Sequence, residues 1–137
     1  MKSRGPSREF FLKYSIALLG LLLAVTGCGR SDATLQQQMA GTWVVDFGGA
    51  IRCTNVIQPN GAYTGTVTGF HDRYVIQIGG TIIAHGGELI ETVTSDSEKK
   101  EPLPMVVRGH IIRLDEYHMI TRWNTKQPIT TIAARVK

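Results

Sequence analysis

The sequence predicts an all-β domain, a small antiparallel barrel or curved sheet of about eight strands, preceded by a short N-terminal helix. Three observations support this fold class. Threonine, valine, isoleucine and aromatic residues dominate from Thr42 onward, and these residue types favour strands. Turn-forming residues recur at intervals of about ten, as in β-sandwiches and barrels. The chain also has no helix-length segment of periodic apolar residues in this region.

A brief helix is expected at residues 33–39, ahead of the first strand. Leu35 and Met39 share one helical face at i, i+4 spacing, and either Ser31 or Asp32 can cap the helix through its side-chain oxygen. Strands are then expected from Thr42 to the C-terminus.

Turn chemistry predicts where the strands reverse. In the segment from Ile57 to Tyr63, Pro59 and Asn60 suit the central positions of a type I turn, and Gly61 suits the left-handed residue of a G1 bulge. A second tight turn is expected at residues 115–116. Residues 94–104, with charges of both signs and two prolines, are expected to form the one long, solvated loop.

Side chains alternate between the two faces of a strand, so residue parity predicts which of them face the core. In the strand before Asp115, this places His110, Ile112 and Leu114 inward and Ile111 and Arg113 outward. The inward set elsewhere is Trp43, Val45, Phe47, Tyr63, Tyr74, Ile76, Ile78, Tyr117, Met119, Thr121 and Trp123. So many large inward groups in about 100 residues indicate a small or absent cavity.

Residues 1–27 have the pattern of a secretory signal peptide. Basic residues lie on both sides of Glu9, an apolar stretch runs from Tyr14 to Val25, and glycines and charged residues follow it. At roughly a dozen residues the stretch is too short to cross a bilayer, which needs about twenty. The segment is therefore expected to be cleaved.

The end of this segment, Val25-Thr26-Gly27-Cys28, resembles the lipobox of bacterial lipoproteins. The resemblance implies cleavage before Cys28, a diacylglycerol on its thiol, and further acylation such as palmitate. Several acyl chains anchor a protein effectively permanently. Residues 28–34 are then the lipidated cysteine and a tether, with residues 35–137 as the single domain. Gly29 replaces the aspartate that marks inner-membrane retention in proteobacterial lipoproteins, which favours the outer membrane in a host that has one.

The leader accounts for the basic character of the chain. Its removal takes four basic residues and one acidic residue from a formal charge of +4 and leaves +1. The remaining charges are interspersed, without the clustered basic face that neutralises phosphates, so we expect no nucleic-acid partner.

Cys53 is expected to be a lone thiol, because a lipidated Cys28 has no free sulfur with which to form a disulfide. Burial as a small apolar residue is the main interpretation, since free cysteine is among the most buried residue types. Catalysis or intermolecular pairing is the alternative.

The helix that leads into Gly41-Thr42-Trp43 resembles the opening signature of the lipocalin superfamily, and Pro59-Asn60-Gly61-Ala62-Tyr63 resembles a hairpin of short bacterial lipocalin-like lipoproteins. The resemblance implies that Trp43 seals one end of a barrel and that an arginine packs over it, Arg135 first and Arg122 second. It also implies a small apolar ligand. The chain departs from the family in its short length and in lacking the Thr-Asp-Tyr segment.

Glu91 is the most informative polar residue. If Leu89 and Val93 face the core, Glu91 does too, and a buried carboxylate needs a ligand or an arginine partner. Alternatively Ile90 faces inward and Glu91 is solvated. The residues expected to line a ligand site are Tyr63, Glu91, Tyr117 and Met119.

We expect neither a metal, nor a cofactor, nor catalysis. The histidines His71, His85, His110 and His118 lack metal-ligand spacing, Gly79-Gly80-Thr81 lacks the lysine of a phosphate loop, and no serine is placed by a scaffold next to a base. Two functions remain open: a membrane-anchored carrier of a small apolar ligand, or a structural or accessory envelope lipoprotein with a filled core that contacts a protein partner.

Overall fold

The computed structural model describes residues 29–48, 50–69, 73–99 and 102–137. The predicted leader and Cys28 lie outside these residues. The described elements are α2 (Asp32–Met39), β1 (Gly41–Asp46), β2 (Arg52–Ile57), β3 (Ala62–Gly69), β4 (Tyr74–His85), β5 (Glu88–Asp96), β6 (Met105–Leu114), β7 (His118–Trp123) and β8 (Ile129–Arg135). All eight strands are antiparallel to their neighbours, which confirms the predicted fold class.

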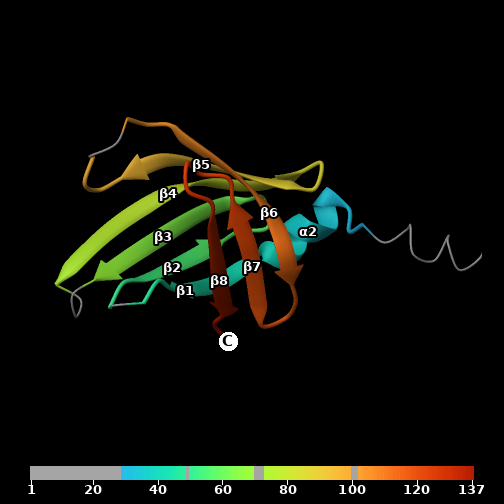
Figure 1. Cartoon of the computed structure of the whole chain (residues 1–137), viewed down its shortest axis with the longest axis horizontal. Coiled ribbons are helices and arrows are strands. Elements are labelled where there is room, and N and C mark those ends of the chain that lie inside the picture. Colours follow the sequence, from blue (N-terminus) through green and yellow to red (C-terminus); the bar gives the residue numbers. More distant parts are fainter. Residues whose placement is uncertain (1–28, 49, 70–72, 100–101) are drawn as a thin grey trace, which may run out of the picture.

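The strands form a closed barrel in which each strand pairs with the next along the chain (Figure 1). The ring closes where β1 pairs with β8, through Trp43 with Arg135, Val44 with Ala134 and Val45 with Ala133. Because this closing ladder spans only three residue pairs, the far ends of β2, β3 and β4 project beyond β7 and β8.

The helix α2 covers the end of the barrel at which β1 begins (Figure 1). Ser31, one of the two caps that the sequence left open, accepts a hydrogen bond from the Thr34 backbone N–H. The helix starts at Asp32, one residue before the expected start, so the tether to the first described element is shorter than residues 28–34. The described residues contain no helix long and apolar enough to cross a membrane.

Side chains of α2 continue the hydrogen bonding of β4 where β3 no longer reaches it. The amide of Gln36 donates to the Ile82 carbonyl and accepts from the Ala84 N–H, each at 3.0 Å. The Asp32 carboxylate accepts from the Gly86 and Gly87 N–H groups, and these bonds hold the pKa of Asp32 below its usual value. The helix is therefore fixed to the barrel by polar bonds as well as by Leu35 and Met39 packing.

Both predicted hairpins are present. Gly61 has φ +87°, the left-handed conformation expected after the turn, and the Ala62 N–H donates to the side chain of Asn60. At the second turn the Asp115 carboxylate accepts from the N–H groups of Tyr117 and His118, at 2.8 and 2.7 Å. The predicted loop begins later than expected, because β5 continues to Asp96.

In β6 the predicted faces were wrong for His110, Ile111 and Ile112, and right for Arg113, which is exposed, and Leu114, which is buried. The register with β7 shifts between Ile111 and Arg113, so one extra residue, Ile112, bulges from the ladder and is 60% exposed. A single inserted residue reverses the faces on either side of it. Ile111 packs against the core, whereas His110 is exposed and lies on the outer surface.

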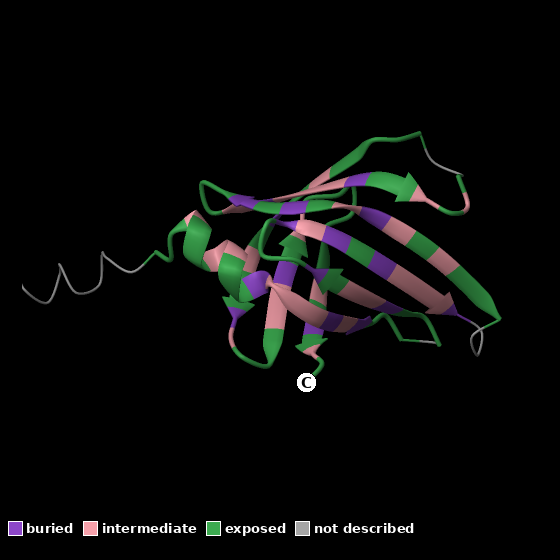
Figure 2. Cartoon of the chain, turned by 180° about the vertical axis from the view of Figure 1, so that it is seen from behind, coloured by how far each residue is buried: buried purple, intermediate pink, exposed green. Residues whose placement is uncertain are grey.

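The buried side chains concentrate toward the α2 end of the barrel (Figure 2). Three residues predicted to fill the interior do not: Phe47, Tyr74 and Tyr117 are 54%, 37% and 50% exposed. Phe47 follows the end of β1, Tyr117 lies in the β6–β7 turn, and Tyr74 is the first residue of β4, where it pairs with Gly69 at the projecting end of the sheet. The core residues are Met39, Trp43, Val45, Cys53, Ile57, Tyr63, Ile82, Ala84, Leu89, Leu114 and Ala133.

A candidate ligand cavity inside the barrel

One end of the barrel is sealed by Trp43, which is fully buried. Its indole N–H donates to the Met39 carbonyl at 2.8 Å, and the Arg135 guanidinium carbon lies 4.2 Å from the ring centroid. Arg135 also donates to the carbonyls of Ala40 and Gln38, at 2.7 and 2.6 Å. The predicted tryptophan–arginine contact is therefore present. It joins the first strand, β1, and the last strand, β8, to the C-terminal end of α2.

Gly41 makes this seal possible. Its φ of +135° is a conformation that side-chain-bearing residues rarely adopt, and a Cβ there would lie 2.5 Å from an Arg135 guanidinium nitrogen. Arg122, the second candidate to cover Trp43, is exposed on β7 instead.

A cavity of about 220 Å³ lies above Trp43, between the middle of the barrel and the ends of the strands farthest from α2. Its walls come from seven of the eight strands, and Phe47 and Trp123 stand at its outer end. The lining residues are Val45, Phe47, Cys53, Asn55, Ile57, Val67, Ile78, Ile82, Glu91, Met119, Thr121, Trp123, Thr131 and Ala133. The prediction that interior bulk would leave a small or absent cavity was therefore too strong, because Tyr74 and Tyr117 do not line the cavity and Phe47 is 54% exposed at its outer end.

Glu91 faces the cavity from β5. Leu89 and Val93, on the same parity, are 1% and 5% exposed, which decides between the two alternatives left open by the sequence. Its partner is a tyrosine rather than an arginine: the Tyr63 hydroxyl donates to Glu91 Oε1 at 2.6 Å. Burial raises the pKa of the Glu91 carboxyl, and the Tyr63 hydrogen bond partly opposes that rise.

Tyr63 reaches Glu91 across β4. Tyr63 on β3 is paired with Gly80, and Gly80 in turn is paired with Val93, two residues along β5 from Glu91. Gly80 lies where the register between β4 and β5 shifts, and a Cβ there would collide with the backbone of Thr92. Burial and the neighbouring carboxylate both raise the pKa of Tyr63, so its hydroxyl stays protonated and continues to donate.

Cys53 lines the same cavity from β2. Its thiol is buried, unpaired by any disulfide, and donates to Asn55 Oδ1 at 3.3 Å. Burial, with the nearby Glu91 charge, raises the pKa of the thiol to about 11. A nucleophilic cysteine needs a lowered pKa, so this thiol has the properties of a small buried polar group rather than of a catalytic one.

The opposite wall is formed by β7 and β8. Met119 and the fully buried Thr121 face the cavity, and the Trp123 indole N–H donates to the Thr131 hydroxyl at 3.0 Å. That bond fixes the tryptophan ring at the outer end. Trp123 and Thr131 were not among the residues expected to contact a ligand, although the inward parity of Trp123 was recognised.

The four residues expected to line a ligand site have different positions. Glu91 and Met119 are in the cavity wall, and Tyr63 supports Glu91 from beneath. Tyr117 lies outside, in the β6–β7 turn, where Lys137 Nζ is 5.2 Å from its ring centroid. It therefore does not line this cavity. Cys53 and Asn55 line it although they were not expected to contact a ligand.

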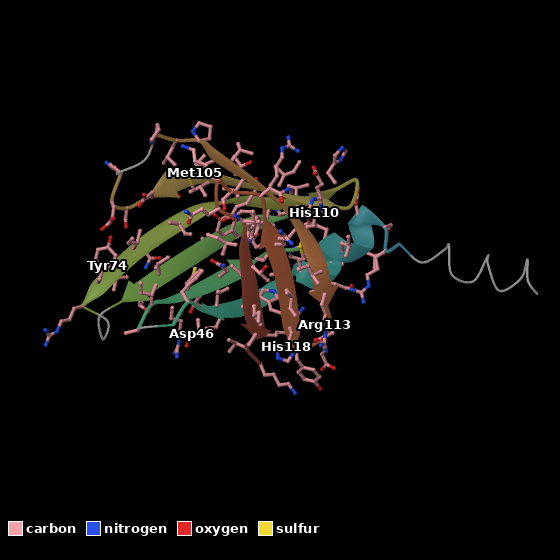
Figure 3. All side chains as sticks on the ribbon, viewed as in Figure 1. Asp46, Tyr74, Met105, His110, Arg113 and His118 are labelled. Carbon is pink, nitrogen blue, oxygen red and sulfur yellow. The ribbon has the colours of Figure 1, made fainter. Side chains whose placement is uncertain are left out.

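The histidines that the structure describes do not join the cavity. His110 Nε2 is 4.0 Å from Glu88 and His118 Nδ1 is 3.7 Å from Asp115, both on the outer surface (Figure 3). His71 lies outside the described residues. Within the described ranges no three histidine, cysteine or acidic side chains gather in a way that would hold a metal ion.

Comparison with known proteins adds no relative: no protein-family model matches the chain, and neither a curated protein nor a solved structure matches it.

Proposed function

We propose that this chain is a lipid-anchored protein of the bacterial cell envelope whose barrel binds a small, mainly apolar molecule. The observation that supports it best is the cavity of about 220 Å³, which is lined mainly by apolar side chains and by a few polar ones. Ligand sites in proteins have this composition. The closed eight-stranded barrel, with a tryptophan and an arginine sealing one end, is compatible with a lipocalin-like fold.

The anchor rests on the lipobox-like Val25–Cys28 segment. The geometry of the first described residues is consistent with it, since Arg30 donates to the Leu114 carbonyl at 2.6 Å, at the end of the barrel that α2 covers. A lipid on Cys28 would hold this sealed end toward the membrane. The outer end of the cavity, near Phe47 and Trp123, would then face away from the bilayer and exchange its ligand with the surrounding compartment.

We infer binding rather than catalysis from the chemistry of the lining. Cys53 is the strongest nucleophile in the cavity wall, and its raised pKa keeps it protonated at neutral pH. Oε1 of the neighbouring Glu91 accepts a hydrogen bond from Tyr63, and most of the lining residues are apolar.

Intact-mass measurement on protein extracted from membranes tests the anchor. We expect a chain that begins at Cys28 and carries a diacylglycerol and an amide-linked acyl group. A species that retains Met1, or an unmodified Cys28 in a bacterium able to process lipoproteins, would contradict it.

Native mass spectrometry tests ligand binding. Val67→Phe places extra volume in the cavity, whereas Val75→Phe adds the same volume at a position that is 50% exposed on the neighbouring strand. We expect a bound small molecule with the wild type and Val75→Phe but not with Val67→Phe. Equal occupancy in both variants would place the ligand elsewhere.

A second function is favoured by the outer surface of β7 and β8. Ile120 and Ile132 are directly paired there, and Ile132 is 59% exposed. A protein partner of the envelope could cover this pair, as the accessory-lipoprotein interpretation requires. The accessory-lipoprotein interpretation also requires a filled core, and the cavity of about 220 Å³ does not agree with this. Crosslinking from position 132 in cells tests this alternative.

A further inference from the structure

The Glu91 carboxylate has an unsatisfied side. Oε1 accepts from the Tyr63 hydroxyl, and within the described residues Oε2 has no hydrogen-bond donor. The carboxylate belongs to the cavity wall, so the open position of Oε2 is in the space a ligand would occupy. A carboxylate has room for about four hydrogen bonds, and only one is used here.

The surroundings supply no positive charge. None of the residues that line the cavity is a lysine, arginine or histidine, and the charged side chains of β6 are exposed on the outside. Arg135, the nearest arginine to the core, is bonded to α2 carbonyls behind Trp43. Glu91 is half-buried and Oε2 is not fully enclosed, so water can reach it in the empty cavity. A ligand that displaces this water must supply a donor or a positive charge in its place, because a carboxylate taken out of water needs such a partner.

The Tyr63 hydrogen bond affects whether the Glu91 carboxyl is ionised or protonated. Burial raises the pKa of the Glu91 carboxyl, whereas the Tyr63 hydroxyl, which donates to Oε1 at 2.6 Å, stabilises the ionised form. An ionised Glu91 attracts cations and donors, and it repels carboxylates and phosphates.

The size of the cavity limits the partner. About 220 Å³ is below the roughly 300–1,000 Å³ of a site for a drug-sized ligand. Phe47 and Trp123 at the outer end supply flat aromatic surface.

From these features we propose that the ligand is a small amphipathic amine, with its ammonium group on Glu91 Oε2 and an apolar, ring-sized body against Met119 and Trp123. This inference rests on the proposed ligand-binding function. It adds the charge and the orientation of the ligand, neither of which the barrel alone specifies.

Three probes of nearly equal size test it: 2-phenylethylamine, 2-phenylethanol and phenylacetate, titrated by calorimetry into the full-length processed chain at pH 7. We expect the amine to bind at least ten-fold more tightly than the alcohol, and the carboxylate to bind most weakly. Equal affinity for amine and alcohol, or tighter binding of phenylacetate, would overturn the inference while leaving a ligand site in place. Failure of all three to bind would overturn both the inference and the proposed ligand-binding function.

Glu91→Gln removes the negative charge of this side chain and keeps its size and shape. We expect it to remove the preference for the amine and to keep the affinity for 2-phenylethanol within about three-fold, which also shows that the variant is folded. Glu88→Gln is the matched control on the same strand, since Glu88 pairs with Arg108 on the outer surface. Glu88→Gln should keep the amine preference. An amine preference that survives in Glu91→Gln would contradict the assignment.

The pH dependence gives an independent readout. The titratable groups that face Glu91 are the Tyr63 hydroxyl from β3 and the Cys53 thiol from β2, and both stay protonated from pH 5 to 8 because their pKa values are raised. The lining side chains of β1, β4, β7 and β8 carry no titratable group. The affinity for the amine should therefore fall as the pH is lowered and Glu91 gains a proton, while the affinity for the alcohol stays constant. Parallel pH profiles for amine and alcohol would overturn the inference.

Discussion

The guanidinium carbon of Arg135 lies 4.2 Å from the ring centroid of Trp43, and the same guanidinium donates to the carbonyls of Gln38 and Ala40. One side chain thus joins the last strand, the first strand and the helix that covers the barrel. Its position beside the fully buried indole makes this end of the barrel a rigid floor for the cavity.

Replacing Trp43 tests that floor. Trp43→Ala removes the largest fully buried side chain and should lower the free energy of unfolding by about 3 to 5 kcal/mol. Urea denaturation followed by circular dichroism measures the change. A loss below about 1 kcal/mol would show that the indole is not part of the packed core.

Arg135→Ala should cost about 2 to 4 kcal/mol, because it removes the stacking contact and two charge-assisted hydrogen bonds. Arg122→Ala is the matched control, since Arg122 is an exposed arginine on the adjacent strand. The control should change the stability by less than about 0.5 kcal/mol. Equal effects of the two substitutions would contradict a special role for Arg135.

Glu91 should destabilise the unliganded barrel at neutral pH. Its folded-state pKa is raised by burial, so the carboxyl favours folding while it is protonated in both states, and this advantage is lost as the pH rises through the folded-state pKa. Glu91→Gln should therefore unfold at a higher urea concentration than the wild type at pH 7 and at nearly the same concentration at pH 4. A variant that is less stable at pH 7 would indicate that the Tyr63 bond outweighs the cost of burial.

Asp115 should have the opposite pH dependence. Backbone N–H donors and Arg113 lower its pKa to about 2 from 3.8, so the ionised carboxylate stabilises the turn above about pH 4, and this stabilisation disappears as the pH falls toward 2. Asp115→Asn should lower Tm at pH 7 and converge with the wild type near pH 2. Glu116→Gln in the same turn should not change Tm. A difference that persists at pH 2 would point to a steric cause.

Cys53 should react slowly. With its pKa raised to about 11 from 9.0, the thiolate fraction at pH 8 is about a hundred-fold lower than in the unfolded chain. Peptide mass mapping after iodoacetamide treatment should therefore show modification of Cys53 in urea and almost none in buffer. Rapid modification of the folded protein would mean that the thiol is activated and would reopen a catalytic interpretation.

Local chemistry made several features predictable. Gly61 must adopt a left-handed conformation after Pro59 and Asn60, and Ser31 caps the helix, because both depend on residues next to each other in sequence. The bulge at Ile112 could not be predicted, since the residues around it alternate normally and only pairing with β7 shows the shift.

The cavity was harder still to predict. It depends on the positions of Phe47, Tyr74 and Tyr117 at or beyond the ends of strands, which strand lengths determine and parity does not. The inward position of Glu91 followed from its neighbours, but its partner Tyr63 lies two strands away, and a single sequence does not show how such strands meet.

The central claim, that the cavity binds a small molecule, is tested most directly by NMR on protein labelled with ¹³C at the methionine methyl groups. Met119 lines the cavity, Met39 is buried behind Trp43, and Met105 is 41% exposed outside it. On titration with 2-phenylethylamine we predict a saturable shift of the Met119 signal alone. A Met119 signal that stays fixed while Met105 moves, or three signals that all stay fixed, would contradict the claim.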